Sequence, residues 1–189
     1  MARLREFEID EALDGVMSVF WRLGFDGASM QDIEAATGLN KQSLYRVFPD
    51  KRAMYLVALR RYEDQEMARA AEILAMEGTA KERFHRLFEG LIALAAKGDR
   101  KGCFLCNAAG EHGPEDAPAA DFVAAAMRRM EKTFREALEA SAPYARDKTR
   151  RDRKAASLMA SYFGIRVMTK ANAPLRAVKA AASDAVEQI

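Results

Sequence analysis

Apolar side chains recur every three to four positions along most of the chain, which is the spacing of one buried face of an α-helix. The pattern predicts a first helix over residues 9–23, with its apolar face at Ile9, Leu13, Val16, Met17, Phe20 and Leu23. Further helices are predicted to begin at Lys51 and run past Met67, and to cover residues 81–97, 103–110, 119–140, 153–168 and 175–188. Strand-forming residues are sparse and alternating patterns are absent, so the predicted fold class is all-α.

Two shorter helices, joined by a tight turn, are predicted between Ser29 and Pro49. Ser29 and Asp32 form an S-x-x-D capping pattern, which starts the first of them. Gly38 follows its last apolar position, where a residue in the left-handed conformation costs least. Asn40 is placed to cap the second helix, and Pro49 to end it. Together these signals predict a helix–turn–helix.

The second short helix is predicted to have two unlike faces. Its inward positions hold Leu44, Val47 and Phe48, and its opposite face carries Lys41, Gln42, Tyr45 and Arg46. A short helix with basic, amide and aromatic side chains in front suits insertion into the major groove of DNA. Lys51, in the first turn of the next helix, is placed to clamp a phosphate. The spacing alone leaves a merely solvated basic face equally open, because many helical proteins contain this shape without binding DNA.

Positive charge is concentrated around this helix rather than spread over the chain. The 189 residues carry a net charge of only +2, which by itself does not indicate nucleic acid. Residues 40–61 contain six basic residues and one acidic residue, whereas residues 1–39 contain three basic and eight acidic residues. The local excess of positive charge favours contact with phosphates, and therefore salt-dependent DNA binding.

The segment from Phe20 to Tyr55 contains a long ordered pattern, FWRLGF before a serine, then AATGL, then SLYRVFPDK. In this pattern the segment resembles the DNA-binding domain of the tetracycline-repressor (TetR/AcrR) family. The resemblance implies an all-α, homodimeric transcriptional regulator, usually a repressor, which a small ligand releases from its operator DNA. It also implies that DNA is touched at Ser29, Lys41, Gln42, Ser43, Tyr45 and Lys51. Arg46 stands where the family varies, and its predicted role in reading bases comes from the geometry of the helix.

We therefore expect two functional units. Residues 1–52 would form the helix–turn–helix DNA-binding domain, with a linking helix to about residue 70, and residues 53–189 the ligand-binding and dimerisation domain. The resemblance implies that the last two helices pair with those of a second copy through apolar stripes at Leu158, Tyr162, Ile165, Leu175, Val178 and Ala182. The small residues Ala155, Ala156, Ala160, Gly164 and Ala181 would permit close approach. The alternative is that these stripes complete the core of the monomer.

The resemblance also implies a ligand pocket among the middle helices. Its candidate lining residues are mostly aromatic residues and methionines: Phe84, Phe88, Cys103, Phe104, Asn107, Phe122, Met127, Met130, Phe134 and Phe163. Side chains of this kind form a core more often than a ligand site, so the expected site is a cavity within the hydrophobic core. The expected effector is a small, mostly apolar molecule with one or two polar groups.

Cys103 and Cys106 form a lone C-x-x-C close to His112, and three interpretations remain open. The thiols could be small hydrophobic side chains in the core. They could form a redox or electrophile sensor, because a thiolate near the start of a helix and near basic residues is unusually reactive. The protein would then be a thiol-responsive regulator, or a stress protein that uses its helix–turn–helix only as a scaffold. A metal site is the third interpretation, but two Cys and one His leave a structural zinc short of ligands.

Other features narrow the class of protein. The N-terminus has no apolar run of a signal peptide, and the longest strongly apolar run, Leu91 to Ala96, is far shorter than the ~18 residues of a membrane span. We therefore expect a cytoplasmic protein with no membrane contact. No motif with hydrolase spacing is present, so we expect neither an enzyme nor a cofactor or metal. The segment 146–154, with six basic and two acidic residues, is expected to be a solvated loop rather than a second nucleic-acid contact.

Overall fold

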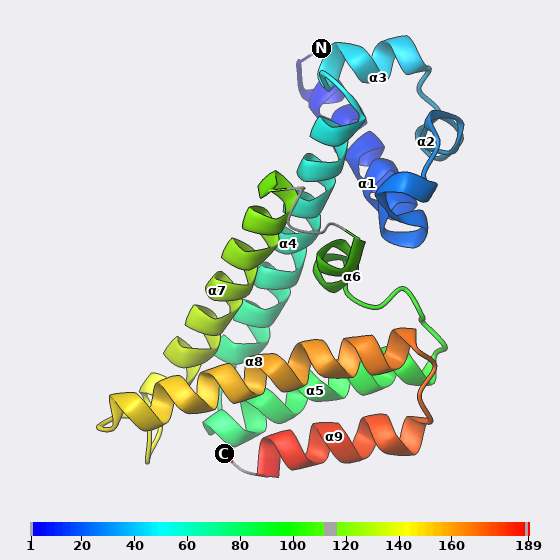
Figure 1. Ribbon diagram of the computed structural model, residues 1–189. Coiled ribbons are helices and arrows are strands. Elements are labelled where there is room, and N and C mark those ends of the chain that lie inside the picture. The colour runs from blue at the N-terminus through cyan, green and yellow to red at the C-terminus, as the bar shows by residue number, and fades with distance from the viewer. Residues whose placement is uncertain (1, 112–116, 188) are drawn as a thin grey trace.

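The computed structural model describes residues 2–111, 117–187 and 189, and within these ranges the chain folds into α-helices without a strand (Figure 1). The all-α prediction is confirmed. In chain order the helices are α1 (Ala2–Gly27), α2 (Met30–Thr37), α3 (Lys41–Val47), α4 (Lys51–Ala75), α5 (Ala80–Ala96), α6 (Phe104–Glu111), α7 (Ala117–Glu139), α8 (Lys148–Lys170) and α9 (Leu175–Glu187).

The helices form two parts joined by α4. The head consists of α1, α2, α3 and residues 51–58 of α4, and the body consists of the rest of α4 with α5 to α9. In Figure 1 the head surrounds the N-terminal end of α4, α7 runs along the same helix, and α5, α8 and α9 form a layer at its other end. The short helix α6 lies between the head and this layer.

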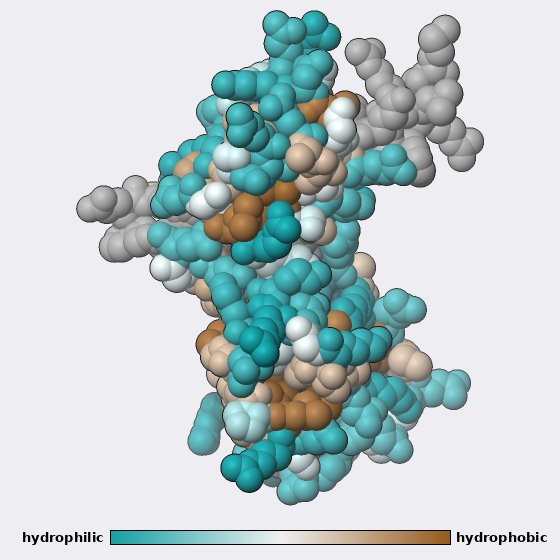
Figure 2. Space-filling view, turned by 90° about the vertical axis from the view of Figure 1, so that its right-hand side faces the viewer, coloured by the Kyte–Doolittle hydropathy of each residue, from teal (hydrophilic) through white to brown (hydrophobic). Residues whose placement is uncertain are grey.

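The surface narrows between the upper and lower parts of the molecule when it is seen from the side (Figure 2). Most of this face is hydrophilic, and its hydrophobic patches are small. No helix in the described ranges is long and apolar enough to span a bilayer.

Local sequence signals fix the helix ends in the head. The Ser29 hydroxyl accepts the Asp32 backbone N–H at 3.1 Å, and the Asp32 carboxylate accepts the Ser29 backbone N–H at 2.9 Å. Gly38 ends α2 with a φ of 70°, in the left-handed conformation. The Asn40 side chain accepts the backbone N–H of Ser43 at 2.9 Å and so caps α3. The helix–turn–helix is built as its capping residues predict.

The helix–turn–helix packs on α1 and α4 through a small apolar core. Phe20, Ile33 and Leu44 are fully buried there. The Tyr55 ring of α4 meets the Phe20 ring edge-on, with 5.2 Å between the ring centres. This packing fixes α3 on the outside of the head, with its apolar side inward.

The core of the body is organised around Tyr162 of α8. The rings of Phe88, Phe134 and Phe163 lie 6.2, 5.8 and 5.6 Å from its ring in edge-to-face contacts. Phe134 also meets Phe84 edge-on at 5.2 Å. Edge-to-face pairs stabilise beyond the apolar area they bury, so this cluster ties α5, α7 and α8 into one unit.

The first helix starts earlier than predicted, at Ala2. Its regular helical backbone ends before Gly24, as predicted, and a short helical segment continues beyond the kink to Gly27. Gly24 has φ 74° and ψ 178°, which glycine adopts at little cost. The interruption lets the Phe25 ring stack on Phe20, with 6.3 Å between the ring centres.

The loop predicted for residues 146–154 is wrong, since α8 already starts at Lys148. Asp147 caps the helix by accepting the backbone N–H of Arg150 at 2.9 Å. Lys148 pairs with Asp152 one turn later, at 3.1 Å. An acidic cap and this ion pair allow a strongly basic segment to form a helix.

Candidate functional site

The outer face of α3 brings together the residues predicted to enter the major groove. Its exposed side chains are Lys41, Gln42, Tyr45 and Arg46, and Leu44 is fully buried behind them. The Lys41 ammonium lies 5.8 Å from the centre of the Tyr45 ring. The face therefore presents two cations, an amide and a phenol side by side. Val47, predicted to point inward, is 48% exposed, because α3 ends there and Phe48 turns into the core instead.

Three further predicted DNA contacts flank this face. Ser43 is half-buried in the first turn of α3. The Ser29 hydroxyl donates to the Asp32 carboxylate at 2.5 Å, so it already caps α2. The Lys51 ammonium, in the first turn of α4, lies 4.6 Å from the centre of the Phe25 ring. All seven predicted DNA contacts lie on the head, but Ser29 and Lys51 also have partners within it.

The residues predicted to line a ligand pocket differ in their burial and surroundings. Phe84, Phe88, Phe134 and Phe163 belong to the cluster around Tyr162, and Met130 and Cys103 are also buried in the core. Phe104 packs between the head and the body. Asn107, Phe122 and Met127 are half-buried, and Arg60 and Arg129 cover the Phe122 ring at 5.5 and 5.9 Å.

A cavity of about 180 Å³ does lie where α1, α4, α5 and α8 approach the loop after α5. Its lining residues are Trp21, Glu66, Arg69, Leu91, Leu94, Asp99, Lys101, Gly102, Arg166 and Thr169. None of them belongs to the predicted pocket. Sequence reasoning missed them because they come from five separate segments, and each charged residue looks like part of an ordinary solvated face.

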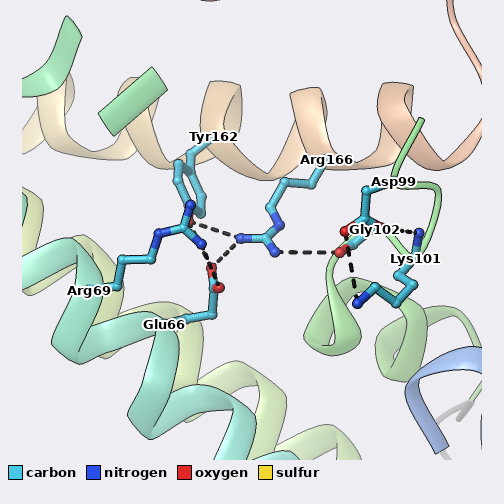
Figure 3. Close-up of polar contacts among 7 residues, drawn as sticks. All are labelled: Glu66, Arg69, Asp99, Lys101, Gly102, Tyr162 and Arg166. Carbon is cyan, nitrogen blue, oxygen red and sulfur yellow. Dashed lines mark hydrogen bonds and ion pairs between the residues drawn. The ribbon is translucent and has the colours of Figure 1, made fainter. Parts of the chain in front are cut away.

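Arg166 is the centre of the polar network beside this cavity (Figure 3). Its side chain is only 5% exposed, and it donates to the Glu66 carboxylate, to the Tyr162 hydroxyl at 3.0 Å and to the Gly102 carbonyl at 3.4 Å. Glu66 also accepts the Tyr162 hydroxyl at 2.9 Å and pairs with Arg69 at 3.8 Å. One carboxylate of α4 is therefore shared by two cations and a phenol.

A second buried carboxylate holds α4 against α7. Glu63 is 4% exposed and accepts a hydrogen bond from the Arg129 guanidinium at 2.8 Å. Glu63 and Glu66 stand three residues apart on α4, and they connect it to α7 and α8 respectively. The position of α4 in the body is thus set by two ion pairs as well as by apolar packing.

The helix α6 connects the head to the body at both of its ends. The Phe104 ring, at its start, lies 5.5 Å from the Tyr55 ring and 5.8 Å from the Tyr62 ring. The Glu111 carboxylate, at its end, accepts the backbone N–H of Phe25 at 3.0 Å. This bond satisfies a donor freed by the interruption of α1 at Gly24. The sequence carries no local signal for it, since 86 positions separate the two residues.

The two thiols lie where the loop after α5 enters α6, Cys103 buried and Cys106 half-buried, and both are free. Burial acts to raise the pKa of the Cys103 thiol, but a hydrogen bond with Cys106 and the charge of Arg166 outweigh it and lower the pKa to about 6. The hydrogen bond with Cys103, together with burial, raises the pKa of Cys106. No group of three metal-binding side chains occurs among the described residues. His112, the third candidate ligand, lies outside them.

The residues predicted for the dimer interface are mostly core residues of a single protomer. Leu158, Tyr162, Ile165, Val178 and Ala182 are each at most 4% exposed, whereas Leu175 is 37% exposed. The exposed face of α8 carries instead Ser157, Ala160, Gly164, Val167 and Ala171. These residues follow a spacing of three and four positions, the seam of two helices that pack along their length.

The N-terminal part of the chain, residues 12–58, matches a family model described as bacterial regulatory proteins, tetR family. The uncharacterized HTH-type transcriptional regulator YezE of Bacillus subtilis (strain 168) is 32% identical over 135 residues, which are 71% of this chain and 70% of the relative. The HTH-type transcriptional repressor ComR of Escherichia coli (strain K12) is 27% identical over 138 residues, 72% of this chain and 66% of the relative.

The fold as a whole is similar to a solved structure that contains DNA. It is a cysteine mutant of the TetR family transcriptional regulator CifR, complexed with 26-bp double-strand operator DNA. The two chains are 25% identical and superpose with a TM-score of 0.83, over 94% of each. The similarity thus extends through the body as well as the head.

Proposed function

Because the chain belongs to the tetR family of bacterial regulatory proteins, we propose that it binds operator DNA as a homodimer and represses transcription until a small effector releases it. The polar outer face of α3, held out by a buried apolar side, is the observation that carries this proposal. Residues 1–52 act as the DNA-binding domain and residues 53–189 as the ligand-binding and dimerisation domain, with α4 linking them. The repressor ComR and the DNA-bound CifR support the choice of operator DNA and of repression.

The side chains of the head divide into those that read bases and those that hold the DNA backbone. Gln42 and Arg46 read base edges, because an amide pairs with adenine and a guanidinium with guanine in the major groove. The other contacts position the helix on phosphates and sugars, through Ser29, Lys41, Ser43, Tyr45 and Lys51. Arg46 is exposed on the same face as Gln42, one turn along α3.

A binding experiment with matched variants tests this division. An operator is first selected from random duplexes, and its affinity is compared with that of a scrambled duplex at two salt concentrations. Lys51→Gln should weaken both duplexes equally, whereas Gln42→Ala should reduce the preference for the operator by about 1–3 kcal/mol. Lys132→Gln, an exposed substitution on α7, serves as the control for lost charge. A protein that selects no sequence, or variants that do not differ in this way, would refute the proposal.

Dimerisation uses the exposed face of α8 together with that of α9. Small residues let two helices approach closely, and Ala160 and Gly164 of α8 and Ala180 of α9 all lie at the surface. Val167, 52% exposed, adds an apolar side chain to the same row. The two heads of a dimer would then meet successive major grooves on one side of the DNA, about 34–36 Å apart.

Gly164→Arg tests the interface, because a Cβ atom added at Gly164 meets no atom within 4 Å beyond the neighbouring backbone. The variant should sediment as a monomer and lose operator affinity while keeping its helical circular dichroism. Ala124→Arg, on the exposed side of α7, adds the same charge outside the proposed interface and should remain a dimer. A Gly164→Arg protein that stays dimeric would move the interface elsewhere.

A second candidate function, a response to electrophiles, is favoured by the surroundings of Cys103. Its pKa of about 6 keeps it ionised at neutral pH. A Michael acceptor such as N-ethylmaleimide would form a bond from its β-carbon to the Cys103 sulfur, and a proton from water would go to the α-carbon. The adduct would enlarge a buried side chain at the start of α6, which contacts the head.

The cysteine variants distinguish this response from non-specific damage. N-ethylmaleimide should weaken operator binding of the wild-type protein and of Cys106→Ser, but leave Cys103→Ser unaffected. Equal loss of binding in all three proteins would exclude Cys103 as a sensor.

A further inference from the structure

We propose that the cavity between α1, α4, α5 and α8 binds a small organic anion, a carboxylate with a short apolar group, and that this anion is the effector. The inference rests on the proposed function for its consequence on DNA, but the binding itself can be measured without DNA. It shifts the sequence-based expectation, a mostly apolar effector with one or two polar groups, toward a charged molecule, because this cavity has charged walls.

The charges around the cavity leave one positive charge in excess. Arg69, Lys101 and Arg166 line it together with only two carboxylates, Glu66 and Asp99. Glu66 is already shared by Arg166, Arg69 and Tyr162, and Asp99 pairs with Lys101 at 3.9 Å. An incoming carboxylate would therefore add the negative charge that this set of side chains lacks, and it could form charge-assisted hydrogen bonds with the cations.

The positions of these cations let them respond to a ligand. Arg166 is fixed by three partners on the protein, whereas the side chains of Arg69 and Lys101 are 46% and 47% exposed and reach the cavity from its rim. A turn of either side chain toward an anion would break its pair with Glu66 or Asp99 but would leave the hydrogen bonds of Arg166 in place (Figure 3). The indole N–H of Trp21, a residue that also lines the cavity, is buried and has no acceptor among the described residues.

The remaining walls of the cavity restrict the size and polarity of the group attached to the carboxylate. Leu91, Leu94 and the Trp21 ring supply apolar surface, which favours an organic group over an inorganic ion. The volume of about 180 Å³ is below the roughly 300 Å³ at which drug-sized ligands begin to fit. A carboxylate with a short aliphatic chain or one ring matches both limits.

The cavity touches the head directly, which gives its occupant a means to affect DNA binding. Trp21 belongs to α1, and its ring is covered by the Lys101 ammonium at 4.3 Å and meets the Tyr62 ring at 4.8 Å. An anion in the cavity would draw Lys101 away from the indole and press on Trp21. The affinity of the cavity for the anion would then differ between two positions of the head. A ligand shifts a conformational equilibrium only if it binds one conformation more tightly than the other.

Matched pairs of probes test the charge of the ligand. Acetate, butyrate and benzoate are compared with acetamide, butyramide and benzamide, which have nearly the same shape without the charge, by calorimetry on the full-length protein. At least one carboxylate should bind more tightly than its amide. Lys101→Gln and Arg69→Gln should each weaken that carboxylate by about tenfold, the loss of one charge-assisted hydrogen bond. Lys97→Gln, an exposed lysine outside the cavity, should leave it unchanged.

The outcomes separate this inference from the proposed function. The anion site is refuted if no carboxylate binds more tightly than its amide. It is also refuted if Lys101→Gln and Arg69→Gln both bind the carboxylate as tightly as the wild-type protein does. Operator binding is unaffected by either outcome. If the carboxylate binds through Lys101 or Arg69 but does not lower operator affinity measured by fluorescence anisotropy, the site stands and its role as effector site is refuted. If the carboxylate binds and no operator can be found, the proposed function fails instead.

Discussion

Replacing Arg166 with Met should show how much the buried network contributes to stability. Methionine keeps most of the length of the arginine stem but removes the guanidinium, which leaves the Glu66 carboxylate, 12% exposed, without its main partner. Removing one side of a buried ion pair costs about 3–5 kcal/mol, mainly because the other charge stays buried. Glu66 keeps the Tyr162 hydroxyl and the rim residue Arg69, so we expect the lower end of this range, about 3 kcal/mol.

The double variant Glu66→Leu/Arg166→Met removes both charges and should recover part of the loss. Recovery stays incomplete because the buried Tyr162 hydroxyl loses both of its partners, which costs about 1 kcal/mol or more. Urea unfolding followed by circular dichroism measures these differences at one fixed protein concentration, since association would stabilise the fold. Lys132→Met, which breaks an exposed pair with Glu136, provides the control and should cost at most about 0.5 kcal/mol. An Arg166→Met protein no less stable than this control, or a double variant no better than the single one, would show that our account of the network is wrong.

Three further predictions concern single positions. Ser29→Ala removes the cap of α2 and should lower the free energy of unfolding by about 1 kcal/mol, measured by the same urea titration. Gly24→Ala should lower the free energy of unfolding by at least about 1 kcal/mol, because φ is 74° at this position and the added Cβ would lie 2.5 Å from the Glu111 carboxylate. Gly110→Ala is the control: it adds a Cβ in open space on a helix and should not lower the thermal unfolding midpoint. Because the pKa of Cys103 is lowered to about 6, its thiolate adds stability fully above the ordinary thiol pKa of 9, and this contribution is lost as the pH falls to 6. Cys103→Ser should flatten that part of the stability–pH curve, and an unchanged curve would contradict the lowered pKa.

The parts of the fold that the sequence predicts are those whose causes are local. Ser29 with Asp32, Gly38 and Asn40 each determine a helix end through neighbours only a few residues away, so the helix–turn–helix could be predicted in detail. Asp147 is a signal of the same kind, and recognising it as a cap would have placed the start of α8 correctly.

The sequence predicts which face of a helix is buried better than it predicts what that face packs against. Leu158, Tyr162 and Ile165 form a buried stripe, as their spacing indicates, but the stripe packs inside the protomer. A periodic pattern shows that a face is covered without showing whether the same chain or another one covers it. The exposed row of small residues that includes Ala160 and Gly164 is too weakly apolar to stand out in the sequence.

The cavity could not be predicted for a different reason. Trp21, Glu66, Lys101 and Arg166 meet only because α1, α4, α8 and the loop after α5 converge, and the ion pair of Glu66 with Arg166 spans 100 positions. Charged residues on amphipathic helices are usually solvated, so nothing in their spacing marks the few that become buried.

The two carboxylates that pair α4 with α7 and α8, Glu63 and Glu66, give that helix a pivot point. Glu63 and Glu66 stand near the middle of a 25-residue helix that is about 37 Å long, and Lys51 lies about 20 Å from them. A rotation of about 5° around this point moves the Lys51 end by roughly 2 Å. In the proposed dimer, two heads swinging in opposite directions would change their separation by about twice as much. Against a groove repeat of about 34 Å, that mismatch is enough to spoil simultaneous docking of both recognition helices. A rearrangement confined to one ion pair of the body can therefore be amplified, through the length of α4, into the loss of a DNA complex.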